Sequence, residues 1–237
     1  MIPLYHDFTG ETVLVFGGGS VGTRKASRFA EEARVVVVSP EFDDRLVDRS
    51  AESAGSASEP ATSDASTDSG APVIELIRAA PSSDTVSEWI DRLSPALVVA
   101  ATDDTMINVA AEAAALDADI LVNRTDVSGD RQAGSVVVPA TVDNDPVRVA
   151  LSTGGASPAL SKVLRERIET ELDDAGAMAE LSGQLRQELK DRGIPFEERR
   201  EAIRRVVRSE GVWKGLQKGR PYARQEADAV IEEVLTQ

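Results

Sequence analysis

A strand-like segment runs directly into a glycine-rich turn whose residue types suit phosphate binding. Residues 12–16 carry no charge and are β-branched, apolar or aromatic, which is typical of a buried parallel strand. The turn that follows places Gly17, Gly19 and Gly22 in the GxGxxG spacing. The first glycine permits a tight turn, the second lets the backbone approach a pyrophosphate, and the third lets the next helix pack closely on the strand. The spacing predicts a dinucleotide phosphate cradle; the alternative is a turn that serves backbone geometry alone.

The elements around this turn follow in the order that a dinucleotide site requires. Apolar residues at helical spacing over 26–33 predict a helix, and residues 34–38 predict a second strand. Glu41 lies about 20 residues past the turn, where a carboxylate can bind ribose hydroxyls. A carboxylate there would repel a 2′-phosphate, so Glu41 favours NAD over NADP. We therefore predict NAD as the cofactor.

Polar turns also follow two later strands. Residues 72–77, 96–101 and 119–123 predict strands, and residues 84–93 and 105–118 predict helices between them. The turn 102–105 leaves one of these strands and the turn 123–126 leaves another. Loops at the carboxyl ends of parallel strands line the ligand crevice, so we expect both turns to border the cofactor. Asp104 or Thr105 can equally cap the helix that follows, and both interpretations can hold for one turn.

The alternation of strands and helices ends after residue 132. Residues 134–140 and 146–151 predict two strands separated by a turn at 143–145, so we expect a hairpin that forms a dimerisation layer. Ser157 and Pro158 predict the start of a helix, and the preceding glycine pair either holds an anion or forms a tight entry turn. The predicted fold is α/β. A Rossmann-type NAD-binding domain (1–132) is followed by a dimerisation region (133–172) and a small C-terminal helical domain (173–237).

Residues 50–70 consist almost wholly of small and acidic types, without lysine, arginine or any apolar residue larger than alanine. Ordering such a segment costs ~1–2 kcal/mol per residue in backbone entropy, which alanine burial cannot offset. We predict a disordered surface insertion.

Composition excludes several classes of function. The chain of 237 residues has no cysteine and one histidine, His6, so we expect no disulfide and no resident metal. The formal net charge of −15 argues against nucleic acid as a partner. With no apolar run of the ~18 residues that a span needs, and no leader pattern, we expect a cytoplasmic protein without a membrane partner.

The charge is unevenly distributed. Only five of the 26 basic residues are lysine, which together with the acidic excess suggests a halophilic source. Residues 186–224 carry 12 basic and 6 acidic side chains, a net of +6. This basic region is either a set of solvated helix faces or a surface that attracts an anionic ligand.

In this order and spacing, several segments resemble the precorrin-2 dehydrogenase family, which also forms the N-terminal module of siroheme synthase. The resemblance covers nearly the whole chain outside 50–70. It is carried by IPLY at 2–5, VFGGGSVG at 15–22, AATDD at 100–104 with Asn108, NRTD at 123–126, and VALSTGGASP at 149–158. Thr153 stands where some members have a second serine, so a regulatory role for that hydroxyl does not carry over.

The resemblance implies NAD-dependent oxidation of precorrin-2 to sirohydrochlorin. It implies Asp126 as the catalytic base; a positioned base contributes typically ~10²–10⁴ in rate. The alternative is an ordinary turn aspartate. Cofactor contacts carried over from the family complete the set predicted from the glycines: Gly17, Gly19, Ser20, Val21, Gly22, Pro40, Glu41, Thr102 and Asp103.

The family also implies a homodimer and, in some members, insertion of Fe²⁺ into the product as a second reaction. The sequence shows no methyltransferase module, so we do not expect the chain to make precorrin-2. Two other hypotheses stay open. A non-catalytic NAD-sensing module would keep Gly17–Gly22 and Glu41 without needing Asp126. A dehydrogenase of another small substrate would lack the usual lysine, tyrosine or histidine acid at a strand end.

Overall fold

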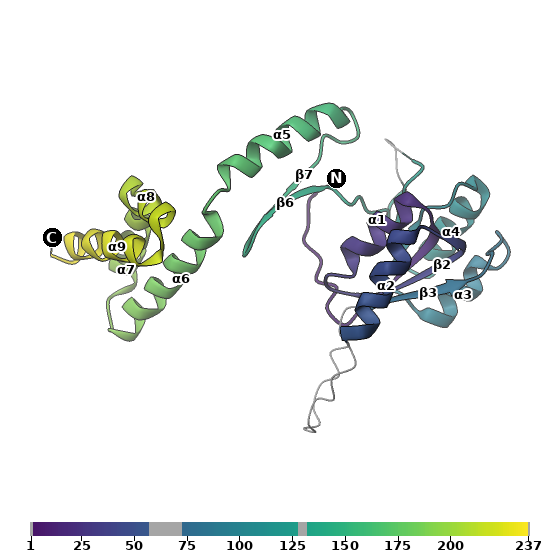
Figure 1. The fold of residues 1–237 in the computed structure, drawn as a ribbon, viewed down its shortest axis with the longest axis horizontal. Coiled ribbons are helices and arrows are strands. Elements are labelled where there is room, and N and C mark those ends of the chain that lie inside the picture. Colours follow the sequence, from purple (N-terminus) through teal and green to yellow (C-terminus); the bar gives the residue numbers. More distant parts are fainter. Residues whose placement is uncertain (1, 57–72, 128–131, 237) are drawn as a thin grey trace, which may run out of the picture. The chain divides into compact units, whose positions relative to one another are not determined.

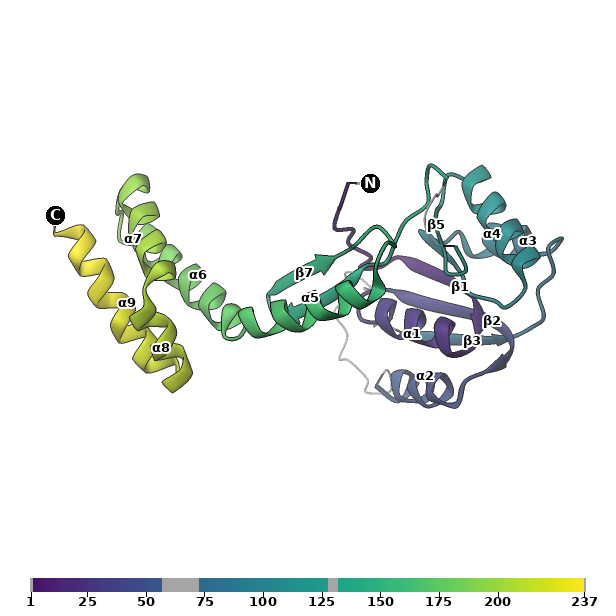
Figure 2. The ribbon, with the colours of Figure 1, turned by 90° about the horizontal axis from the view of Figure 1, so that it is seen from above.

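The computed structural model describes residues 2–56, 73–127 and 132–236, and the chain divides into two compact units, Met1–Val138 and Pro139–Gln237. Each unit is described by itself (Figures 1 and 2). The three domains that the sequence predicts are a finer division, which stays a prediction.

The first unit is a five-stranded parallel sheet with helices between its strands. The sheet order is β3-β2-β1-β4-β5, with strands β1 and β4 paired from Val13↔Leu97 to Phe16↔Ala100. The order reverses direction beside β1, so the carboxyl ends of β1 and β4 flank the crevice in which doubly wound sheets bind ligands. The elements are β1 (Thr12–Gly18), α1 (Ser20–Phe29), β2 (Arg34–Phe42), α2 (Asp44–Ser56), β3 (Ile74–Arg78), α3 (Val86–Leu93), β4 (Leu97–Ala100), α4 (Thr105–Asp117) and β5 (Leu121–Arg124).

Both faces of the sheet are covered, which explains why its strands are continuously apolar. On one face Leu14 and Phe16 pack with residues of α3 and α4. On the other face Val13 and Val15 pack with Ala26 of α1 and Leu46 of α2. Figure 2 shows α1 and α2 on one side of the sheet. Apolar layers on both faces fix the sheet, and the turns at its carboxyl edge are held in place with it.

Helix α2 was not predicted, and it corrects the predicted start of the insertion. It continues through Ser56, so the first seven residues of the segment 50–70 are helical. Ser50 explains part of this difference, because its hydroxyl donates to the Ile74 carbonyl at 2.8 Å and ties the helix to β3. Residues 57–70 lie outside the described part of the chain, and the prediction for them is untested.

The second unit begins with a two-stranded antiparallel hairpin of β6 (Ala140–Asn144) and β7 (Val147–Leu151). The hairpin is confirmed, but its predicted first strand, 134–140, is wrong. Residues 135 and 136 instead lie beside β5: Ser135 bridges Val122, and the Val136 amide donates to the Val122 carbonyl at 2.8 Å. Val136 packs on the core of the first unit, which accounts for the apolar run that suggested a strand.

Five helices follow the hairpin: α5 (Pro158–Glu171), α6 (Ala175–Asp191), α7 (Phe196–Arg208), α8 (Glu210–Lys218) and α9 (Arg220–Leu235). The last four share a core that includes Leu185, Val206 and Ala227. Helix α8 was not predicted, because it holds two glycines in nine residues. Gly215 is required there, since a Cβ would lie 2.7 Å from Ala223 of α9. Within the described residues no helix is both long and apolar enough to cross a membrane.

Candidate functional site

Of the three glycines in the GxGxxG spacing, the fold itself requires Gly17 and Gly22 but not Gly19. Gly17 has φ of +109°, and a Cβ on it would lie 2.4 Å from the Ala101 carbonyl oxygen. A Cβ on Gly22 would lie 1.9 Å from the Gly17 oxygen. Gly19 is exposed, and a Cβ on it would meet nothing within 4 Å. The open space at Gly19 is what close approach of a ligand to the backbone needs.

Helix α1 begins beside this space with its first amides available to an anion. Its N-cap, Gly19, makes no side-chain hydrogen bond, and no acidic residue occupies the first turn. The Gly19 carbonyl instead accepts from the amide and hydroxyl of Thr23, at 2.9 and 3.0 Å. Ser20 is exposed and Val21 half-buried. Free amides and the positive end of the helix dipole favour a phosphate at this position, so the residues fit a dinucleotide.

Strand β2 brings Glu41 to the glycine turn. Gly18 pairs with Phe42, and a Cβ on Gly18 would lie 2.4 Å from the Glu41 carbonyl oxygen. Pro40 and Glu41 are both exposed at this edge. Arg78 of β3 donates to the Pro40 carbonyl at 2.8 Å and lies over the Phe42 ring. The predicted ribose partner therefore lies one strand from the predicted phosphate cradle.

The turn between β4 and α4 is held by one buried amide. Asn108, 1% exposed, accepts from the amide and the hydroxyl of Thr102 at 3.2 and 2.8 Å, and it donates to the Thr102 carbonyl at 3.0 Å. Asp104 is the N-cap of α4 and accepts from the Met106 amide at 2.8 Å, which confirms the capping interpretation. Asp103 is exposed. Thr102 is fixed beside Gly17, because its amide would lie 3.0 Å from a Cβ there.

Asp126 is held by a buried arginine at the end of β5. Arg124, 9% exposed, donates from Nε and Nη2 to the two Asp126 carboxylate oxygens at 3.1 and 2.7 Å. Its Nη1 donates to Glu112 of α4 at 3.0 Å. The second Glu112 oxygen accepts from the Ser135 hydroxyl at 3.3 Å. Asp126 and Arg124 thus belong to one connected polar cluster.

Hydrogen bonds from Arg124 are the main cause that lowers the pKa of Asp126 below the usual aspartate value, with a further hydrogen bond from Asn108. Partial burial opposes this shift without reversing it. The same pairing raises the pKa of Arg124. Asp126 is therefore an ionised carboxylate at neutral pH that can accept a proton.

All predicted site residues of the first unit lie at one edge of the sheet. Contacts link them in series: Glu41 lies against Gly18, Gly17 against Thr102, and Thr102 against Asn108, which also helps to lower the pKa of Asp126. Their roles stay predictions. At this edge the buried Oδ1 of Asn123 accepts no hydrogen bond from the described residues, while its amide nitrogen donates to the Val136 carbonyl.

Sequence reasoning missed the residues that position the others. Asn108 is a lone amide within an alanine-rich helix, and that contrast could have marked it as a buried hydrogen-bonding residue. Glu112 follows it by four residues on the same helix face. As a cation after a strand end, Arg124 could be taken for a partner of carboxylates on a ligand, but the structure gives it two carboxylates of the protein itself. Arg148 on the hairpin is likewise paired with a carboxylate of the protein, Asp143.

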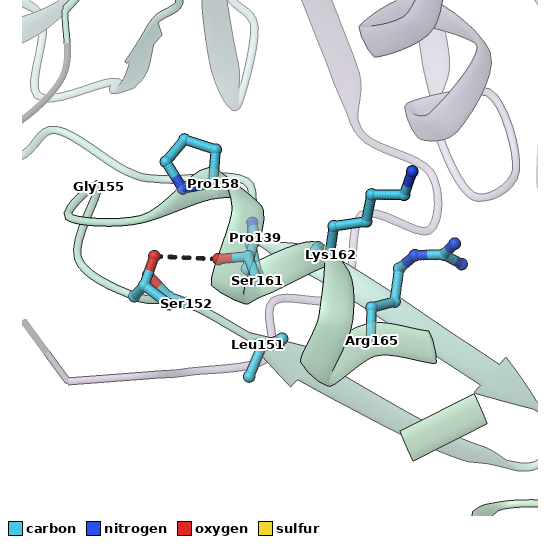
Figure 3. Close-up of a pocket in the computed structure, with 10 residues that line it drawn as sticks. Pro139, Leu151, Ser152, Gly155, Pro158, Ser161, Lys162 and Arg165 are labelled. Atoms are coloured by element: carbon cyan, nitrogen blue, oxygen red, sulfur yellow. Dashed lines mark hydrogen bonds between the residues drawn. The ribbon is translucent and has the colours of Figure 1, made fainter. Parts of the chain in front are cut away.

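The second unit contains a cavity of about 410 Å³ between the hairpin and α5 (Figure 3). Pro139, Leu151 and Pro158 provide apolar lining, and Lys162 and Arg165 extend from α5 at its rim. Thr153 lies within hydrogen-bond distance of the Ser161 hydroxyl, at 2.9 Å. The cavity therefore combines apolar walls with two cations.

The glycine pair beside this cavity forms a tight entry turn. Gly154 and Gly155 have φ of +62° and +81°, and the Gly154 amide donates to the Ser152 hydroxyl at 3.1 Å. Ser157 is the N-cap of α5 as predicted, and its hydroxyl accepts from the Leu160 amide. The protein's own side chains thus satisfy donors in this turn and in the first turn of α5, as expected for an entry turn rather than an anion site.

Among the described residues, no three histidine, cysteine, aspartate or glutamate side chains lie close enough to hold a metal ion.

Two family models match the chain. Residues 4–140 match the family described as "Putative NAD(P)-binding", and residues 144–171 match "Sirohaem biosynthesis protein central". The first match contains every predicted site residue.

Relatives match over almost the full chain. It is 32% identical over 236 residues to a precorrin-2 dehydrogenase from Methanosarcina barkeri, covering 99% of this chain and 95% of that protein. It is 33% identical over 208 residues to a siroheme synthase from Stutzerimonas stutzeri, covering 84% of this chain but 37% of that protein. The chain thus spans less than half the length of the siroheme synthases that it matches. A solved structure named "SirC, precorrin-2 dehydrogenase" superposes with a TM-score of 0.69 at 22% identity, covering 98% of this chain and 100% of that one, which shows a shared fold.

Proposed function

From the premise that the chain belongs to the family of precorrin-2 dehydrogenases and siroheme synthase N-terminal modules, we propose that it oxidises precorrin-2 to sirohydrochlorin with NAD⁺. The reaction removes one hydride and one proton from the macrocycle. The observation that carries the proposal is a buried ion cluster that presents an ionised Asp126 at the same sheet edge as the glycine turn. A module that only senses NAD would not need that carboxylate.

The glycine turn and Glu41 bind the cofactor in this proposal. The amides at the start of α1 hold the pyrophosphate beside Gly19, and Ser20 and Val21 line it. Glu41 and Pro40 contact the adenosine ribose, and Glu41 repels a 2′-phosphate, which makes NAD⁺ the preferred cofactor. Thr102 and Asp103 border the nicotinamide half. When bound, NAD⁺ supplies the hydride acceptor.

Asp126 accepts the proton that leaves the ring. The carboxylate is ionised before substrate binds, because its pKa is lowered chiefly by Arg124. Once protonated, it returns the proton to solvent readily, since the neighbouring guanidinium favours the charged form. Asn108 holds Thr102 by hydrogen bonds and contributes to the lowered pKa of Asp126, so in this proposal it links the cofactor side of the site to the base.

We further propose that the chain forms a homodimer through the hairpin and α5. Helix α5 has no buried residue in this chain, and its Leu160 and Val163 are 49% and 43% exposed. Exposed apolar side chains on an amphipathic helix suit an interface between subunits. Light scattering at high salt should give twice the mass of one chain; a monomer at all concentrations tested would contradict this.

The test of the proposed function is anaerobic turnover of enzymatically generated precorrin-2 with NAD⁺, followed by NADH absorbance and formation of sirohydrochlorin. Wild type should turn over, and Asp126→Ala should bind NAD⁺ normally but turn over at least ~10²-fold more slowly. Equal activity of the variant would make Asp126 a structural turn residue. Binding of NAD⁺ without any turnover by wild type would leave the NAD-sensing module as the better hypothesis.

The same experiment measures ferrochelation. With sirohydrochlorin formed, Fe²⁺ is added as a substrate. Asp126 would accept the two pyrrole protons that metal insertion releases one after the other, passing the first to solvent before it takes the second. Siroheme formation faster than the enzyme-free rate, and slowed in Asp126→Ala, would establish the second reaction. A rate equal to the enzyme-free control would restrict the chain to dehydrogenation.

A further inference from the structure

Arg124 is a buried cation that bridges two carboxylates from different elements. It is the last residue of β5, and its side chain is 10% exposed. One edge of the guanidinium faces Asp126 through Nε and Nη2, and Nη1 faces Glu112 of α4. Two parallel hydrogen bonds to one carboxylate fix the orientation of that carboxylate as well as its distance.

The far side of this bridge is itself held in place. The Glu112 side chain is 13% exposed and accepts from the Ser135 hydroxyl, so it is tied to the segment that follows β5 along the sheet edge. The charged groups of the described residues around Asp126 are Arg124 from β5 and, behind it, Glu112 from α4. Asn108 from α4 and Ser135 are neutral. At this low exposure the ion pairs are screened much less than surface pairs.

We propose that Arg124 is the positioning residue of the proton-accepting step: held by Glu112, it orients the two oxygens of Asp126 at the edge of the sheet without touching the substrate. The inference rests on the proposed role of Asp126 as the base. The proton from the macrocycle forms a bond with one Asp126 oxygen and is then released to solvent. Arg124 keeps its own proton throughout, because its pKa is raised by the same hydrogen bonds.

This role differs from that of a substrate anchor. A cation that binds a substrate carboxylate contributes to KM, whereas a residue that orients the base contributes mainly to kcat. Small displacements of a catalytic group, of the order of 1 Å, can lower a rate ~10²-fold. Removing Arg124 should therefore lower kcat and leave KM for precorrin-2 nearly unchanged.

The chain offers a matched control. Arg45 and Asp43 form the same bidentate pair at the same spacing of two residues, with Nε and Nη2 on the two oxygens at 2.9 and 2.7 Å. The Arg45 side chain is 72% exposed, and the pair takes no part in the proposed chemistry. Arg45→Ala removes the same groups from the surface of the same unit.

The experiment compares wild type, Arg124→Ala, Glu112→Gln, Asp126→Ala and Arg45→Ala. NAD⁺ affinity and thermal melting establish folding, and anaerobic kinetics give kcat and KM for precorrin-2. We expect kcat of Arg124→Ala to fall at least ~10-fold with KM within about threefold. Millimolar guanidinium should raise kcat of Arg124→Ala at least about threefold. It should leave kcat of Asp126→Ala unchanged. Arg45→Ala should resemble wild type with and without guanidinium.

Three outcomes would overturn the inference: unchanged kinetics in Arg124→Ala, a loss confined to KM, or a loss that guanidinium does not repair. If Arg124→Ala fails to fold, Glu112→Gln decides, since it loosens the far end of the bridge: a fall in kcat at constant KM supports the inference, and wild-type kinetics overturn it. A fully active Asp126→Ala would refute the base and with it the Arg124 assignment, while the dehydrogenase activity itself would stand. Absence of turnover by wild type would instead refute the proposed function.

Discussion

Replacing Gly19 by alanine separates a cofactor cradle from a turn that serves only backbone geometry. Gly19 has φ of −75° and ψ of −174°, an extended conformation open to any residue, and its added Cβ would meet no protein atom within 4 Å. Alanine should therefore be accepted by the fold. The methyl group would stand in the space beside the first amides of α1, where the pyrophosphate is proposed to lie.

The structure sets the expected magnitudes. Alanine is a poorer N-cap than glycine by only about 0.5 kcal/mol, so the free energy of unfolding of Gly19→Ala should stay close to that of wild type. If the methyl group displaces two charge-assisted hydrogen bonds to the pyrophosphate, each worth ~1.5–3 kcal/mol, the affinity for NAD⁺ should fall at least ~10²-fold.

Gly17→Ala and Gly22→Ala should, unlike Gly19→Ala, lower the stability of the fold. The first would place a Cβ 2.4 Å from the Ala101 oxygen at φ of +109°, and the second would place one 1.9 Å from the Gly17 oxygen. Overpacking and backbone strain each cost roughly 1–3 kcal/mol, so both variants should be destabilised, with Tm lowered by about 4 °C or more.

The assay pairs calorimetric titration of NAD⁺ with thermal melting. Gly183→Ala is the matched control, because a Cβ at this position of α6 would also meet nothing within 4 Å. Gly183 lies in the second unit, whereas the proposed cradle lies in the first. It should bind NAD⁺ as wild type does. If Gly19→Ala is folded and its Kd for NAD⁺ stays within threefold of wild type, the cradle is refuted and the glycines serve the turn alone.

Three further predictions concern the same edge of the sheet. Glu41→Gln removes the negative charge while keeping an acceptor, so the ratio of Kd values for NADP⁺ and NAD⁺ should fall at least ~10-fold in direct titrations; an unchanged ratio would show that Glu41 does not select the cofactor. The pKa of Asp126 lies below its ordinary value of 3.8, so the pH profile of kcat/KM should show no acid limb from this group above pH ~5. The stability that the ionised Asp126 provides should be lost only as pH falls through the lowered pKa. An apparent pKa near 6 in the kcat/KM profile that disappears in Asp126→Ala would contradict this prediction. Asn108→Leu leaves the half-buried amide and carbonyl of Thr102 without their hydrogen-bond partner. Tm should therefore fall by several degrees, reflecting ~1–3 kcal/mol, and the affinity for NAD⁺ should fall with it; a melting curve like that of wild type would mean that the amide is not needed.

Much of the first unit follows from local sequence patterns. Uncharged β-branched runs predict buried parallel strands wherever both faces of a sheet are covered, and the glycine spacing locates the turn after β1. These signals act within a few residues of one another. Helix α2 was missed for the opposite reason: its residues are polar and small, and its attachment to β3 depends on a Ser50 hydroxyl bond across 24 positions of chain.

The apolar run at 134–140 shows where local pattern misleads. A valine-rich segment can pair in a hairpin or lie along the open edge of another sheet, and its periodicity is the same in both cases. The outcome depends on partners that are distant in the sequence. Here the Val122 carbonyl accepts from the Val136 amide, and Asn123 donates to the Val136 carbonyl, so the segment joins the first unit and β6 begins only at Ala140.

The residues of the candidate site also divide into those indicated by local sequence pattern and those that depend on partners distant in the sequence. Residues proposed to contact the cofactor are predictable, because a dinucleotide imposes their spacing along the chain. Residues proposed to orient Asp126 are not, since Asn108, Glu112 and Arg124 meet only when α4 packs beside β5. A charged residue directly after a buried strand nevertheless carries information: its backbone is fixed by the sheet, so a buried Arg124 must find carboxylates or remain an unpaired charge at high cost. Asp126 and Glu112 meet that requirement, and this is why Asp126 differs physically from an ordinary turn aspartate.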